Sequence, residues 1–253
     1  MIAGKTFREI RWMALAYLLI LELLCVPVLL WWPDMYDALK KSSLFRNLGI
    51  DVAKMVLQGV TDDNEHVAYR NWVALMLFLR SSNLVGVASA VLFGTGLFAR
   101  ERENQTFELL LSRPVSRGSI LWHKVWPVSL CVIVPLFVVN ASAMLWSRAI
   151  DESIPPYELF LATTHAAVFL LMFLLGTTWL SVRFRVQAHV AAAVGAFAVL
   201  QIGLYLTQRI RPFTLFRFAD FEWYSPILNG NTKAWQMFDV LHAKGYTTWL
   251  LLA

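Results

Sequence analysis

The sequence predicts an all-α polytopic membrane protein. Of its 253 residues, 58% are hydrophobic and only 15% are charged, whereas an ordinary soluble domain carries about 25% charged residues. A soluble chain of this length cannot bury so much apolar surface, and several apolar runs match the roughly 20 residues that a helix needs to cross a bilayer. This composition excludes a disordered chain, a disulfide-rich secreted scaffold and a soluble nucleic-acid-binding protein.

The apolar runs predict a single transmembrane domain, 1–253. Its spans are expected at residues 12–32, 81–99, 125–146, 159–182 and 190–207, with the start of a sixth at residue 247. The sixth run ends at Ala253, which gives about 10 Å of helix, a third of the hydrocarbon core. We therefore expect the natural chain to continue through most of a sixth span.

The first apolar run is expected to remain in the membrane, because it is longer than the apolar region of a signal peptide and no small-residue cleavage site follows it. Before this run, Phe7 and Ile10 alternate with Lys5, Arg8 and Arg11. This pattern predicts an N-terminal amphipathic helix that lies in the membrane interface.

Lys and Arg are distributed unevenly among the segments that connect the spans. They are about twice as dense in 1–11, 100–124 and 183–189 as in the alternate segments 33–71, 147–158 and 208–246. Positive charge favours the cytoplasmic side. The distribution therefore predicts a cytoplasmic N-terminus, and it explains the net charge of +5 without a nucleic-acid partner.

The two long outer segments have their own patterns. Residues 33–71 carry apolar side chains at helical spacing, and residues 208–246 are rich in aromatic side chains. Two interpretations are open: both segments form interfacial caps on the outer leaflet, which we favour because aromatic rings anchor in headgroups, or they enclose a small extracytoplasmic vestibule.

The loop 100–124 has an unusual pattern between its two spans. Thr106 can cap a short helix, in which Phe107, Leu110 and Leu111 share one face. Pro114 disfavours further helix, and Ser116 can cap the next one, which continues past Lys124 into the third span. The loop is thus predicted to be a short amphipathic helix between two turns, which suits docking into a groove on a partner.

This loop resembles that of the ABC-2-type transporter permeases, and most closely the small six-span permeases of the copper-enzyme-maturation type. The resemblance rests on Glu101-Arg102-Glu103 with Thr106, on Leu110-Leu111-Ser112 with Pro114-Val115-Ser116-Arg117, and on Ile120 and Lys124. It covers about a tenth of the chain.

The resemblance implies a fold, a mechanism and partners. It implies a six-helix ABC-2-type transmembrane domain in a bacterial cytoplasmic membrane, whose loop is the coupling helix that docks on a separate ATP-binding cassette subunit. A second permease subunit would complete a dimer, with a homodimer expected, and the lipid bilayer would surround it. ATP and Mg would be bound by the ATPase subunit, and this chain would bind no cofactor and catalyse no reaction by itself.

The resemblance also implies roles for single residues of the loop. Glu101, Arg102 and Glu103 would form ion pairs or hydrogen bonds at the ATPase interface, and Phe107, Leu110 and Leu111 would fill its groove. The residues implied at this docking site are Glu101, Arg102, Glu103, Thr106, Phe107, Leu110, Leu111, Pro114, Ser116, Arg117 and Lys124. The alternative is that the charges only end the second span at the headgroups.

Gly4-Lys5-Thr6 resembles the end of a phosphate-binding loop, but the preceding glycine and strand that such a loop needs are missing. The sequence therefore predicts no ATPase site in this chain.

Four polar residues in or beside the spans are candidates for a substrate path, because such residues are costly in a membrane. They are Glu22, Arg80, His165 and Gln201. Glu22 could contact substrate or form a hydrogen bond across the bundle. Arg80, just outside the predicted second span, is expected to snorkel outward.

His165 and His189 suggest a membrane haem protein as a third hypothesis. Their expected positions at opposite ends of the membrane argue against it, and no metal ligands are predicted.

The sequence therefore favours a permease subunit that couples ATP hydrolysis by a separate ATPase to export or translocation of a substrate that it does not identify. The main alternative is an ABC-like complex that transmits force to an extracytoplasmic protein without transport, through segments 33–71 and 208–246. Fold alone cannot separate these two functions.

Overall fold

The computed structural model describes residues 2–41, 55–58, 64–105, 116–205, 207, 210 and 213–231. Its elements are α1 (Ile2–Leu30), α2 (Trp32–Lys41), α5 (His66–Val73), η1 (Ala74–Val85), α6 (Gly86–Thr95), α7 (Ala99–Glu103), α9 (Arg117–Arg148), α10 (Pro156–Arg183), α11 (Gln187–Tyr205), η3 (Leu215–Ala219) and α12 (Phe221–Leu228). Within these ranges the chain forms helices and no strands. The start of the predicted sixth span lies outside the described residues.

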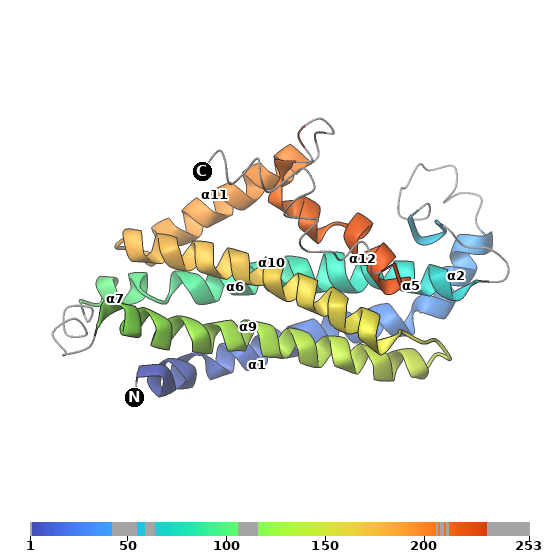
Figure 1. Cartoon of the computed structure of the whole chain (residues 1–253), viewed down its shortest axis with the longest axis horizontal. Coiled ribbons are helices and arrows are strands. Elements are labelled where there is room, and N and C mark those ends of the chain that lie inside the picture. Colours follow the sequence, from blue (N-terminus) through green and yellow to red (C-terminus); the bar gives the residue numbers. More distant parts are fainter. Residues whose placement is uncertain are drawn as a thin grey trace.

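Five long helices in the described part of the chain confirm the predicted fold class. Those long and apolar enough to cross a membrane are Thr6–Leu30, His66–Glu103, Arg117–Arg148, Pro156–Arg183 and Gln187–Tyr205. They form an elongated bundle (Figure 1), with α7 and the start of α1 at one end and α2, α5 and the α9–α10 turn at the other. We call these the α7 end and the α2 end.

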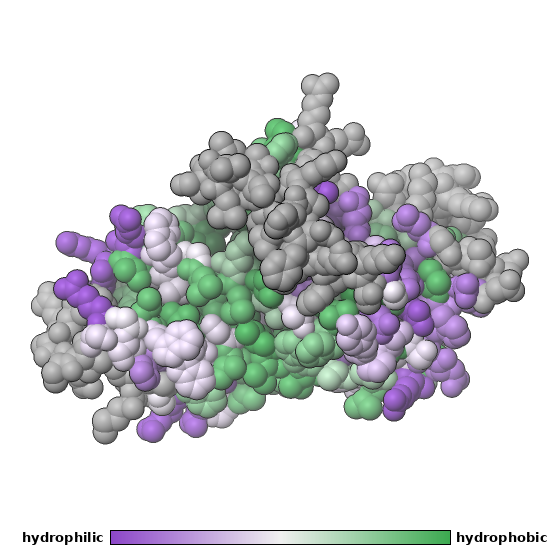
Figure 2. Space-filling view, viewed as in Figure 1, coloured by the Kyte–Doolittle hydropathy of each residue, from purple (hydrophilic) through white to green (hydrophobic). Residues whose placement is uncertain are grey.

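Exposed tryptophans mark the depth of the bilayer on α1. Trp12 and Trp31, which directly follows α1, are 68% and 65% exposed, and a separation of 19 positions corresponds to about 28 Å of helix. This length matches the hydrocarbon core, and tryptophan favours its two boundaries. Figure 2 shows the same division as a hydrophobic middle between two more hydrophilic ends.

The first helix differs from the prediction at its start. α1 is continuous from Ile2 to Leu30, so residues 2–11 form its first turns and not a separate interfacial helix. Tyr17, Leu21, Cys25 and Leu29 are buried along one stripe of this helix. This four-residue spacing lets α1 lie along α9 over much of its length.

The second span is longer than predicted, and the placement of Arg80 outside it was wrong. The helix begins at His66, so Arg80 lies well inside it. The prediction began at residue 81 because Asn71 and Arg80 interrupt the apolar run. In the structure Asn71 is buried and hydrogen-bonded, which removes the cost of placing an amide there.

The centre of this span is wound as a π-helix, η1. Wider winding disturbs the usual backbone ladder, and such segments are frequently found at functional sites. The Ser81 hydroxyl donates a 3.0 Å hydrogen bond to the Met76 carbonyl, so one acceptor in the widened turn is satisfied by a side chain. The winding also brings Ser82 and Asn83 to the core, where both are buried.

Two glycines allow α6 to approach α10 closely. A Cβ added at Gly86 would lie 2.5 Å from Leu170 Cδ1, and one added at Gly94 would lie 2.8 Å from Thr177 Cβ. Small residues at helix contacts permit the close packing on which membrane helices depend. α10 and α6 therefore form the tightly packed centre of the bundle.

The described part of segment 208–246 packs into the bundle and does not cover it as an interfacial cap. Asn83 Nδ2 lies 3.0 Å from the Tyr224 hydroxyl oxygen, and the Asn71 carboxamide oxygen accepts hydrogen bonds from Ser225 and Asn229. Burial raises the pKa of Tyr224 far above the usual range of a phenol, so its hydroxyl stays protonated. These contacts fix α12 against α5 and η1.

At the α2 end, one carboxylate joins three parts of the chain. Glu152, in the α9–α10 turn, accepts a 3.3 Å hydrogen bond from Trp32 Nε1 and lies 2.8 Å from His66 Nδ1. Beside it, the Tyr69 and Ser147 hydroxyls are 2.6 Å apart. The described parts of segment 33–71 are thus attached to the bundle, whereas most of residues 42–63 lies outside the described ranges.

Replacing Asn83 with Leu should lower the thermal unfolding midpoint of the purified protein in detergent. It deprives the buried Tyr224 hydroxyl of its partner, at a cost of about 1 kcal/mol. Tyr224→Phe removes the other partner. The double variant should lose less stability than the sum of the two single losses, and strictly additive losses would contradict the contact.

Candidate functional site

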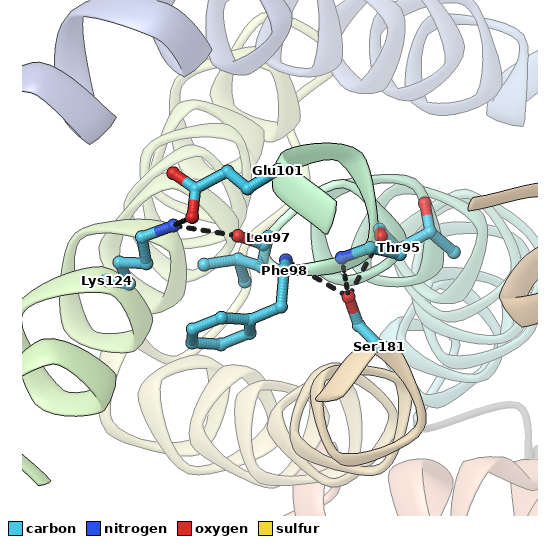
Figure 3. Close-up of polar contacts among 7 residues, drawn as sticks. Thr95, Leu97, Phe98, Glu101, Lys124 and Ser181 are labelled. Carbon is cyan, nitrogen blue, oxygen red and sulfur yellow. Dashed lines mark hydrogen bonds and ion pairs between the residues drawn. The ribbon is translucent and has the colours of Figure 1, made fainter. Parts of the chain in front are cut away.

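The candidate site lies at the α7 end and is centred on a buried ammonium group. The Lys124 side chain, on α9, is 5% exposed and forms an ion pair with the Glu101 carboxylate on α7. Its Nζ also donates a 3.0 Å hydrogen bond to the Leu97 carbonyl and lies 4.9 Å from the centre of the Phe98 ring (Figure 3). A buried charge is tolerated only when it is paired in this way.

The position of Lys124 in the bundle depends on where α9 begins. The Ser116 hydroxyl accepts a hydrogen bond from the Ser119 N–H at 3.3 Å, which confirms the predicted cap. Lys124 follows about two turns later, on the face that carries the buried Ile120 and Val128. The cap thus sets where the lysine enters the bundle.

A helix break next to Lys124 is held by a serine of α10. α6 ends at Thr95 and α7 begins at Ala99, so several backbone groups lose their helical partners. The Ser181 hydroxyl accepts hydrogen bonds from the N–H groups of Phe98 (3.1 Å) and Ala99 (2.9 Å) and donates one to the Thr95 carbonyl (3.1 Å), as Figure 3 shows. One buried side chain therefore satisfies three backbone groups.

The first turn of α11 is also attached to α7. The Gln187 N–H donates a 3.3 Å hydrogen bond to the Glu103 carboxylate, and Gln187 Nε2 lies 3.4 Å from the Thr95 hydroxyl oxygen. Gln187 is the first residue of α11, where a negative charge is favoured by the helix dipole.

We call these contacts of residues 95–103 with Lys124, Ser181 and Gln187 the α7 junction. Through it α7 contacts three spans: α9, α10 and α11. In the sequence, α7 lies directly before segment 106–115, and the Ser116 cap lies directly after that segment. A displacement of that segment would therefore reach three helices at once.

An open cavity of about 410 Å³ lies beside the junction. Its lining includes Thr6, Glu9, Ile10 and Met13 from α1, Leu97, Arg100, Glu101 and Asn104 around α7, Lys124 and Val128 from α9, and Gln187 from α11. The start of α1 thus faces the same space as the charged residues of α7.

The predicted docking residues have different positions. Glu101, Arg102, Glu103, Ser116, Arg117 and Lys124 are described, whereas Thr106, Phe107, Leu110, Leu111 and Pro114 lie outside the described residues. Glu101 and Glu103 have partners within this chain, which the loop pattern did not indicate. A contact of either with an ATPase stays a prediction.

Sequence reasoning missed Ser181, Gln187 and the Leu97 carbonyl. A serine within an apolar run gives no signal of the helix break that it satisfies on another helix. The signal available was Lys124 itself, a charge at the start of an apolar span, which implies a buried partner.

Glu22 is hydrogen-bonded across the bundle from α1 to α9. Its carboxylate accepts hydrogen bonds from the Ser142 hydroxyl at 2.9 Å and from Trp146 Nε1 at 3.0 Å. The structure thus shows the expected hydrogen bond across the bundle, whereas a contact of Glu22 with a substrate stays a prediction.

Two further candidate residues hold the segment that precedes α12. The Gln201 side-chain oxygen accepts a 3.0 Å hydrogen bond from the Leu215 N–H. His165 Nε2 lies 2.6 Å from the Phe218 carbonyl oxygen, and the imidazole stacks on Trp223. Both side chains act between helices of this chain.

Arg80 lies on the exposed side of η1. Its Nη1 is 3.7 Å from Met76 Sδ, one turn toward the α2 end. The side chain therefore extends along the helix toward that end, as a snorkelling arginine does. The four candidates do not form one site, and the described residues contain no cluster of three His, Cys, Asp or Glu that could hold a metal ion.

Comparison with known families identifies the chain. The sequence profile described as "ABC-2 family transporter protein" matches residues 8–212. The chain belongs to the ABC-2 transporter family. No curated protein and no solved structure matches it significantly. As a family member it is a multi-pass membrane permease component of an ABC transporter, a class that is generally non-catalytic and works with an ATP-binding cassette ATPase subunit.

Replacing Ser181 with Ala should loosen the α7 junction without unfolding the bundle. The change leaves the buried N–H groups of Phe98 and Ala99 unsatisfied, at a cost of about 1–3 kcal/mol. We expect faster hydrogen–deuterium exchange in residues 96–104, measured by mass spectrometry.

The matched control is Ser129→Ala on α9, because the Ser129 hydroxyl donates its hydrogen bond to the Val125 carbonyl of its own helix. It should leave exchange in residues 96–104 unchanged. Equal exchange in wild type and Ser181→Ala would show that the serine does not hold the break.

Proposed function

We propose that this chain is a permease subunit in which segment 106–115 docks on a separate ATP-binding cassette ATPase and the α7 junction transmits the movement of that ATPase to the spans. The α7 junction carries the proposal, because it connects the two borders of the segment to α9, α10 and α11. In this arrangement two permease subunits, expected to be identical, translocate a substrate across the membrane.

The charge distribution supports a cytoplasmic position for the α7 end. Arg100, Arg102, Arg117, Arg183 and Arg185 all lie in the segments that border it, and positive charge favours the cytoplasmic side. The start of α1 lies at the same end (Figure 1). The N-terminus would then face the cytoplasm of a bacterial cell, where ATP is available.

In the proposed mechanism, ATP and Mg on the partner supply the energy, and this chain supplies binding and rigid transmission. The apolar face expected from Phe107, Leu110 and Leu111 enters a groove of the ATPase. When the groove moves, Glu101 and Lys124 move α9, and Ser181 moves α10. Since buried hydrogen bonds and ion pairs hold these contacts, they transmit displacement instead of absorbing it.

The alternative, force transmission to an extracytoplasmic protein, needs an outer surface that presents segments 33–71 and 208–246. α12, in the described part of the second segment, is turned inward, with Phe221, Tyr224, Ile227 and Leu228 buried. This favours transport. ATPase stimulation by a candidate substrate in liposomes would support transport, whereas stimulation only by an added external protein would support force transmission.

Replacing Leu110 with Asp should reduce the amount of ATPase that co-purifies with the tagged chain from its native membrane. A carboxylate in an apolar groove is unpaired and costly, so we expect at least a tenfold loss. Mass spectrometry of the purified complex identifies and quantifies the ATPase. The control is Gln105→Asp, which adds the same charge at an exposed turn. Equal loss in both variants would contradict docking by this face.

Replacing Lys124 with Met tests whether Glu101 acts within the chain or at the ATPase. The single variant leaves the Glu101 carboxylate without its ammonium partner and should reduce co-purified ATPase by distorting α7. Removing both charges of a buried pair costs much less than removing one. The double variant Glu101→Gln/Lys124→Met should therefore recover assembly. If the double variant stays defective while folded, Glu101 contacts the ATPase directly.

A further inference from the structure

A groove with almost entirely apolar walls lies between α10, α11 and η3, apart from the α7 junction. Its volume is about 300 Å³, and its lining includes Phe173, Gly176 and Trp179 of α10, Val194 and Phe197 of α11, and Leu215 of η3. α11 turns back at the α7 end and then diverges from α10 (Figure 1). In an 18-residue apolar stretch of each helix, only 17% of α11 is buried, against 56% of α10.

The groove lies in one leaflet. Its α10 residues, from Met172 to Leu180, precede the helix end at Arg183 by 3–11 residues, which places them about 5–17 Å from that end. Half of a hydrocarbon core is about 15 Å thick. The groove therefore extends from the bilayer centre to the surface at the α7 end, the depth that one lipid chain occupies.

The groove is open on its α10 side. Among the residues that the structure describes, no atom lies within 4 Å of a Cβ added at Gly176, and Trp179 is 60% exposed. An apolar space of this kind offers nothing to which water could bond. Within a bilayer its natural occupant is a hydrocarbon chain.

Positive charge lies where the groove meets the membrane surface. The Arg183 guanidinium is 5.3 Å from the centre of the Trp179 ring, and Arg185 follows in the α10–α11 turn with its side chain exposed. Neither arginine forms an ion pair with a described residue, and the nearby Glu103 carboxylate bonds the Gln187 N–H. Basic pockets between membrane helices on the cytoplasmic side bind anionic lipid headgroups.

We propose that this groove binds an anionic phospholipid, with one acyl chain against Gly176, Phe197 and Leu215 and the phosphate at Arg183 and Arg185. The apolar walls, the single-leaflet depth and the basic rim together select this lipid over an uncharged one. The site does not depend on ATPase docking. Only the assignment of its leaflet as cytoplasmic rests on the proposed function.

Native mass spectrometry of the purified full chain in mild detergent tests the proposal. Phosphatidylglycerol or phosphatidylcholine with the same acyl chains is added in increasing amounts. Wild type should retain phosphatidylglycerol at least tenfold more tightly. Arg183→Gln/Arg185→Gln should remove most of this preference, because each basic side chain near an anionic headgroup contributes about fivefold in affinity. Gly176→Trp should fill the groove and reduce binding of both lipids at least tenfold.

Two controls separate the groove from general lipid adhesion. Arg148→Gln removes an exposed charge at the α2 end. Gly203→Trp adds the same bulk at a glycine of α11 that, like Gly176, has no described atom near its added Cβ but does not line the groove. Both should bind lipid as wild type does. Unchanged binding in Gly176→Trp, or the same loss in Gly203→Trp, would overturn the site. Gly176→Leu, a smaller change, should give an intermediate loss if the larger variant fails to fold.

If the wild-type chain shows no lipid preference but co-purifies the ATPase normally, the lipid site is contradicted and the proposed function is not. If it binds lipid as expected but no ATPase co-purifies, the proposed function is contradicted and the lipid site is not.

Discussion

The buried ammonium of Lys124 is the constraint on which the α7 end depends. A charge at the entrance to an apolar span must be paired, because its desolvation costs several kcal/mol. Its partners, the Glu101 carboxylate and the Leu97 carbonyl, lie where α6 has ended and α7 begins. The lysine therefore requires the helix break, the break requires the Ser181 hydroxyl, and α9, α10 and α7 become one connected unit. The charge pair gives the borders of segment 106–115 a defined geometry.

The α2 half is held by polar contacts of another kind. Asn71 and Asn83 bond side chains of α12, and His165 bonds the backbone just before it. In a membrane interior, packing and such hydrogen bonds replace the hydrophobic effect as the force between helices. α12 therefore acts as part of the core. The two ends of the bundle are thus specified by different means: a buried lysine–carboxylate pair at one end, and at the other asparagine amides and hydroxyls together with the Glu152 carboxylate.

The sequence was sufficient for the features that depend on local pattern. Apolar runs predicted the helical fold class because only a helix satisfies its own backbone in hydrocarbon, and Ser116 predicted a cap that the structure confirms. The sequence was insufficient where the role of a residue depends on a partner far away along the chain. Asn71 and Arg80 appeared to end the second span, since hydropathy cannot show that Asn71 is hydrogen-bonded or that Arg80 extends along its helix. Ser181 gave no signal because its role is to satisfy another helix.

The contrast between α10 and α11 connects the junction to the rest of the bundle. Glycines bring α6 against α10, so these two helices are tightly packed. α11 has most of its surface exposed, and Gln187 and Gln201, near its two ends, form hydrogen bonds to other elements. A helix fixed at both ends and loosely packed between them can tilt at little cost. A displacement that enters through Glu103 and Gln187 would therefore change the separation of α10 and α11 before it disturbed the core.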